Sequence, residues 1–305
     1  MSSTRIKYPA CPCCQSADIH SVLVSADHVS GELFEIWECA VCSVRFTQNV
    51  PDANAIKAYY QSEDYISHTD TSKGLVNRMY HFVRKRTLAG KYKLVVSALK
   101  ASPGDQETDQ RSILDIGAGT GAFVHYMGTK GWQATGLEPD EGARQRALNL
   151  HKIKLLPTEH LSEIKENSLS AVSLWHVLEH VHAIHVYLEQ LKKIISPSGR
   201  IFIAVPNYTC YDAAVYKKYW AAYDVPRHLY HFSPAAMKQL LRMHALKLYA
   251  IHPMWYDSFY ISMLSEKYKT GHSNIIKGSF TGAASNLKAL LKNERCCSLI
   301  YIAGK

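Results

Sequence analysis

The sequence predicts an α/β fold in which helices cover both faces of a mostly parallel sheet. From residue 112 onward, short apolar runs alternate with stretches of helical periodicity, the pattern of parallel strands joined by crossover helices. A glycine-rich loop directly follows the first of these apolar runs and opens a helix. The chain has 305 residues, which is enough for one such domain and a small additional module.

The elements of this domain are expected in a regular order along the chain. Strands are expected at 113–116, 134–137, 171–175 and 201–205, and two late strands at 246–251 and 298–302. Helices are expected at 122–130, at 184–195 and from Pro234 to about His244. Ser233 and Pro234 support the start of the last helix, because Ser is a good N-cap and Pro suits the first helical position. Residues 257–292 remain ambiguous.

Two further regions precede this domain and complete the predicted division of the chain. Residues 1–50 are expected to form a small cysteine-bearing module with short β-runs at 19–24 and 33–37. Residues 51–110 are expected to be a helical connector, with a polar loop from 101 to 111. Residues 111–305 are then the main domain.

Composition and charge narrow the possible functions. Apolar residues make up 47% and charged residues 20% of the chain, as in an ordinary globular protein. No run is apolar and long enough to span a bilayer, and the first ten residues lack the apolar region of a secretory signal. The expected compartment is therefore the cytoplasm. The net charge is +9, but the basic residues are dispersed apart from Arg84, Lys85 and Arg86, where a solvated helix face is expected.

Four cysteines in the first 50 residues predict a structural zinc site. Cys11 and Cys14 form one C-x₂-C pair, and Cys39 and Cys42 form a second one after 24 intervening residues. Two such pairs provide the four thiolates of a tetrahedral zinc site, and in a reducing compartment metal binding is favoured over disulfides. Cys13 would be a spare thiol, and free thiols throughout are the alternative.

The glycine-rich loop predicts a nucleoside-binding site. It runs from Asp115 to Gly121 with the pattern Asp-Ile-Gly-Ala-Gly-Thr-Gly. This loop is shorter than the Gly-x-Gly-x-x-Gly of dinucleotide sites, and a carboxylate at Asp115 would repel a pyrophosphate. About twenty residues later, Glu138 can accept both ribose hydroxyls. These features favour a nucleoside whose tail is not a polyphosphate, and a domain that binds NAD or no cofactor is the alternative.

In this combination of motifs the sequence resembles class I S-adenosylmethionine-dependent methyltransferases. The resemblance rests on the glycine loop, on Glu138, and on Leu178-Glu179-His180 after the fourth strand, and it covers residues 112–206 best. It implies a Rossmann-like sheet with an antiparallel late strand and S-adenosylmethionine as cofactor. The implied cofactor site comprises Asp115, Gly117, Ala118, Gly119, Gly121, Glu138, Pro139, Trp175 and His176. Asp115 would lie near the amino group of the methionine part, and Glu138 would bind the ribose.

The segment from His176 to His180 also has the His-x-x-Glu-His pattern of certain zinc proteases. That chemistry requires a helix and a further ligand, whereas this segment follows a strand directly. In the resembling methyltransferases the same stretch lies beneath the substrate. Glu179 and His180 are therefore candidates to position a substrate or a divalent cation, and the alternative is that they only orient the loop.

An aromatic segment follows the predicted fifth strand and is expected to cover the methyl acceptor, together with 257–292. Its end, from His228 to Ser233, resembles a segment of zinc-bearing sugar C-methyltransferases in which the histidine is a proposed base. The resemblance implies His228 as a base, and its neutral-range pKa suits proton removal. Arg227 stands where those enzymes tend to carry Glu. The alternative role for His228 is packing beside the start of the helix at Ser233.

The sequence therefore predicts methyl transfer to an oxygen or carbon of a small metabolite. The acceptor classes considered are a sugar nucleotide, a phenol or quinone-like compound, and a cell-envelope precursor. The alternative is an RNA methyltransferase that uses the zinc module and positive charge to bind the phosphate backbone. A Pro-Pro-Tyr motif for base amines is missing after the fourth strand, and this disfavours RNA. A cofactor-binding module without catalysis is a third hypothesis.

Overall fold

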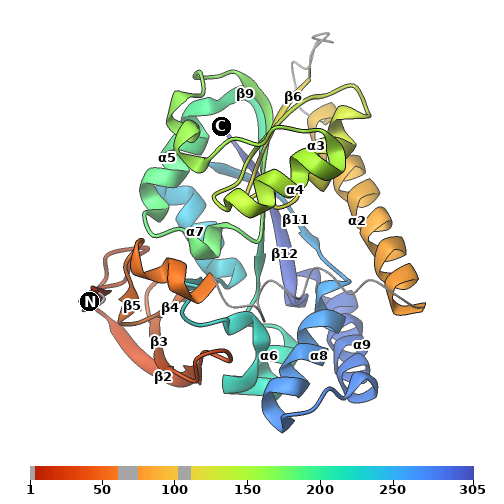
Figure 1. Ribbon diagram of the computed structural model, residues 1–305. Helices are drawn as coiled ribbons and strands as arrows, with labels where there is room; N and C mark the ends of the chain where they lie inside the picture. Colours follow the sequence, from red (N-terminus) through yellow and green to blue (C-terminus); the bar gives the residue numbers. More distant parts are fainter. Residues whose placement is uncertain (1–3, 61–74, 102–110) are drawn as a thin grey trace.

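A six-stranded sheet forms the centre of the molecule (Figure 1). The computed structural model describes residues 4–60, 75–101 and 111–305. The strands are β6 (Ser112–Ile116), β7 (Gln133–Leu137), β8 (Leu169–Trp175), β9 (Ile195–Pro206), β11 (Lys247–Pro253) and β12 (Ser298–Gly304). Their order is β11-β12-β9-β8-β6-β7, in which β12 is antiparallel to both of its neighbours and β6 to β9 pair in parallel. The predicted Rossmann-like sheet with an antiparallel late strand is confirmed.

Helices pack on both faces of this sheet. They are α2 (Leu75–Lys100), α3 (Ala122–Gly128), α4 (Glu141–His151), α5 (Ile184–Ile194) and α7 (Pro234–Met243), with the short 3₁₀ helix η2 (Thr158–Glu163). Successive strand residues face opposite sides, so Ile113 packs with Val95 of α2 and Phe123 of α3. Its neighbour Leu114 packs in the other core with Leu188 of α5. The sheet is thus buried on both sides, as expected for parallel strands.

The start of α7 follows the prediction. The Ser233 side chain accepts a hydrogen bond from the Ala236 amide at 3.0 Å, and Pro234 takes the first helical position. By contrast, α4 was not predicted, although Asp140 caps it by accepting from the Ala143 amide. Most of the predicted loop at 101–111 lies outside the described residues.

The N-terminal module is a small sheet that a distant segment completes. Its strands are β2 (Ile19–Ala26), β3 (Leu33–Cys39) and β4 (Arg45–Thr47), and β1 (Arg5–Ile6) pairs separately with β5 (Val50–Pro51). The 3₁₀ helix η1 (Ala55–Tyr60) follows. The two-residue strand β10 (Tyr230–His231) joins the edge of β4, with Tyr230 opposite Phe46. The module is therefore hydrogen-bonded to the segment that contains His228.

A group of helices lies beyond one end of the sheet, at the bottom of Figure 1. It comprises α6 (Tyr211–Tyr216), η4 (Lys217–Tyr219), η5 (Ala221–Tyr223), α8 (Asp257–Thr270), α9 (Ile275–Leu291) and η6 (Asn293–Arg295). The ambiguous residues 257–292 are thus two helices. Three aromatic residues of the 208–232 segment are almost fully buried in one core here, namely Tyr216, Trp220 and Tyr223. Their rings therefore belong to the packed interior and are not exposed on a surface. Among the helices that the structure describes, none is sufficiently long and apolar to cross a membrane.

Candidate active site

The glycine loop after β6 has left-handed backbone at three positions. The φ angles are 67° at Gly117, 55° at Gly119 and 75° at Gly121, which side chains rarely tolerate. A Cβ on Gly117 would lie 2.5 Å from Cγ2 of Val177, so the loop packs directly against the segment after β8. A Cβ on Gly119 would meet no atom within 4 Å. The loop is therefore closed at Gly117 and open at Gly119, where a ligand can approach its backbone.

Glu138, at the end of β7, lies against this loop. Its Oε2 accepts a hydrogen bond from the Gly119 amide at 2.7 Å, and its Oε1 accepts from the Asp140 amide at 3.0 Å. The Ala118 amide donates to the carbonyl of Leu137 at 3.0 Å. Burial raises the pKa of Glu138 above its ordinary value. The loop and the acid, predicted from separate motifs, are thus brought together.

Asp115 lies beneath the loop beside a lysine that the sequence analysis missed. Its Oδ1 accepts a hydrogen bond from the Ser173 hydroxyl at 2.6 Å, and burial raises its pKa to about 6 against the opposing effects of Ser173 and Lys91. The Nζ of Lys91, on α2, is 4.1 Å from the ring centroid of Trp175, and burial lowers its pKa to about 8. No local motif marks Lys91, because its role depends on how α2 packs on the sheet. An acid, Asp115, and a base, Lys91, therefore lie near the predicted position of the methionine part of the cofactor.

His176 connects the end of β8 to α8. It has a left-handed φ of 58°, and its Nε2 lies 2.9 Å from Oδ2 of Asp257, a second residue that the sequence analysis missed. Its Nδ1 is 3.4 Å from Oε1 of Glu179. Burial alone would lower the pKa of His176, but the two carboxylates raise it to about 10. His176 is therefore an imidazolium held between two acids, and the role predicted for it in the cofactor pocket stays a prediction.

Glu179, His180 and His228 converge on one point. One ligand atom from each lies within 4.8 Å of those of the other two, and the two imidazole rings are 4.6 Å apart and nearly perpendicular. Glu179 is fully buried, and within the described residues neither of its carboxylate oxygens has a hydrogen-bond partner. Burial raises its pKa, but His176 and the other histidines outweigh this effect and hold it below the ordinary value. The site thus contains a buried carboxylate with unused acceptor capacity.

Hydrogen bonds orient the rings of the two histidines. Nδ1–H of His228 donates to the carbonyl of Ala222 at 2.9 Å. Nδ1 of His180 lies 3.0 Å from the carbonyl of Arg227, which can only accept, and 2.9 Å from the hydroxyl of Tyr60, so we assign its proton to Nδ1. With the proton on Nδ1, the lone pair of a neutral ring lies on Nε2. Burial and the nearby His228 lower the pKa of His180 to about 4, so His180 is neutral at pH 7. Both rings can accept a proton or bind a cation through Nε2.

The N-terminal module holds the backbone of His228. The hydroxyl of Thr47, in β4, donates to the carbonyl of His228 at 2.7 Å, and the Thr47 amide donates to that of Leu229 at 2.9 Å. Arg227 is buried between two acids, 2.9 Å from Asp27 of the module and 2.6 Å from Asp224. Arg227 therefore connects the N-terminal module to the segment of His228.

The four predicted zinc ligands lie together. The Sγ atoms of Cys11 and Cys42 are 3.5 Å apart, as are those of Cys14 and Cys39, and all four lie within 4.8 Å of one another. Thiolates 2.3 Å from a tetrahedral zinc are about 3.8 Å apart, so this set fits that ion. The Cys13 pKa is well above its ordinary value because of its hydrogen bond with Cys11 and its burial, so it stays a thiol.

The zinc-protease interpretation of residues 176–180 is not supported. Residues 178–180 form the short 3₁₀ helix η3 (Leu178–His180), which lacks the α-helical spacing that the zinc-protease pattern requires.

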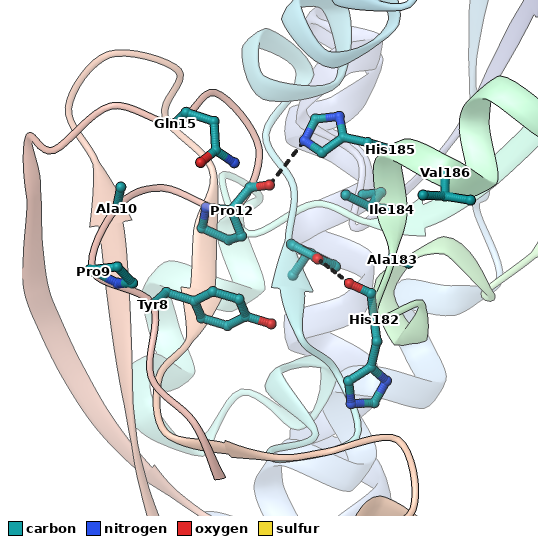
Figure 2. A pocket seen from close by; sticks show the side chains of 11 residues that line it. Tyr8, Pro9, Ala10, Pro12, Gln15, His182, Ala183, Ile184, His185 and Val186 are labelled. Carbon is teal, nitrogen blue, oxygen red and sulfur yellow. Dashed lines mark hydrogen bonds between the residues drawn. The ribbon is translucent and has the colours of Figure 1, made fainter.

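A pocket also lies apart from the active site. A pocket of about 300 Å³ lies between the cysteine module and the start of α5 (Figure 2). There Nε2–H of His185 donates to the carbonyl of Pro12 at 3.1 Å. None of the predicted cofactor or catalytic residues lines this pocket.

Comparison with known proteins gives a family for the chain. A family model described as "Methyltransferase domain" matches residues 80–250. The chain is 24% identical over 171 residues to a ubiquinone biosynthesis O-methyltransferase of Idiomarina loihiensis, covering 52% of this chain and 70% of the relative. It is 24% identical over 165 residues to the mitochondrial enzyme of that name from Homo sapiens, covering 48% and 44%.

A similar solved structure has an equally low identity. It is that of an S-adenosylmethionine-dependent methyltransferase from Archaeoglobus fulgidus, with 18% identity and a TM-score of 0.45, covering 74% of this chain and all of that one. The family model, by contrast, covers more than half of this chain. The chain therefore belongs to the methyltransferase domain family and is a methyltransferase.

Proposed function

We propose that this enzyme methylates an oxygen or carbon of a small metabolite, with His228 as the base. The observation that carries this proposal is the cluster of Glu179, His180 and His228 beside the glycine loop. A phenol or quinone-like hydroxyl is the first acceptor class to test, because the matched relatives are named for ubiquinone biosynthesis. A sugar nucleotide, suggested by the likeness to sugar C-methyltransferases, and a cell-envelope precursor are the other two.

The cofactor site is proposed to use the charges beneath the glycine loop. Asp115 would bind the ammonium group of S-adenosylmethionine and Lys91 its carboxylate, because these two groups carry opposite charges side by side. Glu138 would exchange its amide partners for ribose hydroxyls, and the open side of Gly119 leaves room for the ligand. Gly117, Ala118, Gly121, Pro139 and Trp175 would border the cofactor.

In the proposed chemistry the protein supplies a proton acceptor and two residues that assist it. The bound cofactor supplies a methyl group on a positively charged sulfur, which keeps the electrons of the broken S–C bond. Nε2 of His228 takes the proton of the acceptor as the new O–C or C–C bond forms. The carboxylate of Glu179 stabilises the imidazolium that results, and neutral His180 helps to orient the acceptor.

The cysteine module is proposed to hold a structural zinc ion in a cytoplasmic enzyme. The geometry of the four sulfurs supports this, together with the small size of the module, which has little apolar core of its own. Zinc would keep β4 in place, and β4 binds the backbone of His228 through Thr47. The ion would therefore support catalysis without touching the reactants.

The test is an acceptor screen with S-adenosylmethionine followed by two matched variants. His228→Asn should lower turnover by roughly 10²- to 10⁴-fold and leave cofactor affinity unchanged. His160→Asn changes a half-exposed histidine that is not part of the cluster, and it should leave turnover and cofactor affinity unchanged. Full turnover by His228→Asn would refute the assignment of the base. Methylation of RNA alone, with binding that falls steeply with salt, would favour the RNA alternative.

A divalent cation is a second candidate for deprotonating the acceptor at the same three groups. Two Nε2 lone pairs and the Glu179 carboxylate, whose Oε1 also lies 3.4 Å from Nδ1 of His176, form a 2-His-1-carboxylate set, which binds divalent cations. The base mechanism predicts that turnover survives dialysis against a chelator that leaves the cysteine site loaded. Loss of turnover under those conditions, restored by Mg²⁺ or Mn²⁺, would instead favour the cation.

A further inference from the structure

Helix α9 turns its small residues inward. Its buried positions are Gly278, Gly282, Ser285 and Ala289. A Cβ on Gly278 would lie 2.6 Å from the Cα of Met263, and one on Gly282 would lie 2.8 Å from the carbonyl oxygen of Ser258. The two helices α8 and α9 therefore pack with their backbones in close approach, and the inner face of α9 has no room for large side chains.

The outer face of α9 carries the large apolar side chains instead. We call this set the apolar stripe, and it consists of Ile276, Phe280, Leu287, Leu290 and Leu291. At 3.6 residues per turn these positions fall on one side of the helix, opposite the buried glycines. Each of the five is between 66% and 91% exposed. The polarity of α9 is thus reversed relative to a helix that packs on a core and faces water.

The two helices α8 and α9 carry more positive than negative charge. Residues 257–292 contain five lysines and only two acids. The acids are not free, because Asp257 is paired with His176, and Glu266 is buried and accepts from Nζ of Lys277 at 2.7 Å. The lysines are Lys267, Lys269, Lys277, Lys288 and Lys292. Lys277 is thus compensated by Glu266, and the other four lysines, which have no acid partner among the described residues, give α8 and α9 a positive net charge.

We propose that α9 docks this enzyme onto an anionic membrane surface. The helix would lie in the plane of the membrane, with the apolar stripe at the boundary of the acyl chains and the lysines on lipid phosphates. Its 17 residues span about 26 Å along the axis, long enough to lie flat with the whole stripe engaged. This surface is separate from the catalytic chemistry and goes beyond the proposed function.

A second copy of the chain fits the stripe less well than a membrane does. Two α9 helices packed face to face would bring two sets of lysines together without acids between them, and like charges across an interface disfavour it. An anionic surface has the complementary charge. The docking surface is connected to the active site, since Asp257 begins α8 and binds His176. A membrane-bound enzyme could therefore receive an acceptor from the lipid phase.

The test is co-sedimentation of the full chain with lipid vesicles. The wild type should sediment with vesicles of phosphatidylcholine mixed with phosphatidylglycerol, and remain in solution with phosphatidylcholine alone. The double variant Phe280→Asp/Leu287→Asp should stay in solution with both. Val186→Asp, a matched change at a residue 71% exposed on α5, should behave as the wild type. Lys269→Gln and Lys292→Gln should each weaken binding roughly five-fold.

Three results would overturn the proposal. The first is a folded wild type that fails to sediment with anionic vesicles. The second is a double variant that sediments as well as the wild type. The third is a wild-type dimer in analytical ultracentrifugation that the double variant converts to a monomer, which would assign the stripe to a second copy. Unchanged thermal unfolding of the double variant verifies that the fold is intact, because both side chains are exposed.

Discussion

His176 and Asp257 form an ion pair in which Nε2 and Oδ2 are 2.9 Å apart, although 81 residues separate them in the sequence. The pair connects the first residue of α8 to the residue that follows β8. His176 has a left-handed φ at this point, a conformation that costs free energy and persists only where surrounding contacts hold it. We interpret the pair as the contact that positions the helical group of α8 and α9 beside the active site.

This ion pair predicts a characteristic dependence of stability on pH. The pKa of His176 is raised to about 10, so its contribution is complete below the ordinary histidine pKa of about 6.5 and is lost as pH rises through 10. The pKa of Asp257 is lowered, so its contribution is lost as pH falls below the ordinary value of about 3.9. The wild type should therefore exceed Asp257→Asn in Tm most between about pH 4 and 6.5.

Thermal unfolding of both proteins across pH measures this difference. Asp18→Asn provides a control, since Asp18 is exposed and lies in the N-terminal module. The control should follow the wild type at every pH. A gap between wild type and Asp257→Asn that stays constant from pH 6 to above pH 10 would show that His176 is not the partner that titrates.

The sequence was sufficient for the sheet because strands and helices leave periodic apolar patterns. The strands β6 to β9 and the capped start of α7 are examples, since alternation and a Ser-Pro pair are local signals. Helix α4 was missed because only two of its residues, Ala143 and Ala147, are buried, which leaves almost no apolar period. Residues 257–292 were ambiguous because α9 has apolar residues on its outer face.

Site residues that belong to a sequence motif could be predicted. Residues that contact them from distant parts of the chain, and that belong to no motif, could not. His228 and Glu179 come from separate motifs, and the fold brings them together as expected for residues at one end of a sheet. Lys91 and Asp257 sit in helices without any motif. Their roles arise from tertiary packing, which places them against Asp115 and His176, and no local pattern encodes that packing.

The second prediction concerns Lys91 and the tail of the cofactor. Lys91→Met should weaken S-adenosylmethionine binding roughly 10- to 100-fold, because a charge-assisted hydrogen bond to the carboxylate is lost. Methylthioadenosine lacks that carboxylate, so its affinity should change little. The control Lys93→Met alters an exposed lysine on the same helix. Calorimetric titration with both ligands measures these affinities.

The same pair of charges predicts the pH range of cofactor binding. Asp115 loses its charge as pH falls through about 6, and Lys91 loses its charge as pH rises through about 8. Affinity for S-adenosylmethionine should be highest between these values and fall on both sides. In Lys91→Met the fall above pH 8 should become shallower, because only the loss of the cofactor's own ammonium charge still contributes to it, while the fall below pH 6 remains. An unchanged alkaline limb would remove Lys91 from the site.

The third prediction is one zinc ion per chain. Cys39→Ser should lose it, because three thiolates bind zinc far more weakly than four and the small module depends on the ion. Cys13→Ala should keep it, since Cys13 is not among the four converging sulfurs. Metal analysis measures the zinc content of the two variants, and far-UV circular dichroism measures their secondary structure. Turnover should fall in Cys39→Ser because β4 would release His228, and full zinc in this variant would contradict the assignment.

The fourth prediction concerns the buried contact between the module and the site. Arg227 and Asp27 are 3% and 1% exposed, so Arg227→Met leaves two acids in the interior without a cation. Breaking such a pair costs about 3–5 kcal/mol of unfolding free energy, measurable with denaturant. Arg227→Met/Asp27→Asn should be less destabilised than the sum of its single variants, because only the less buried Asp224 then remains charged without Arg227. Additive single effects would mean that the two side chains do not interact across the junction.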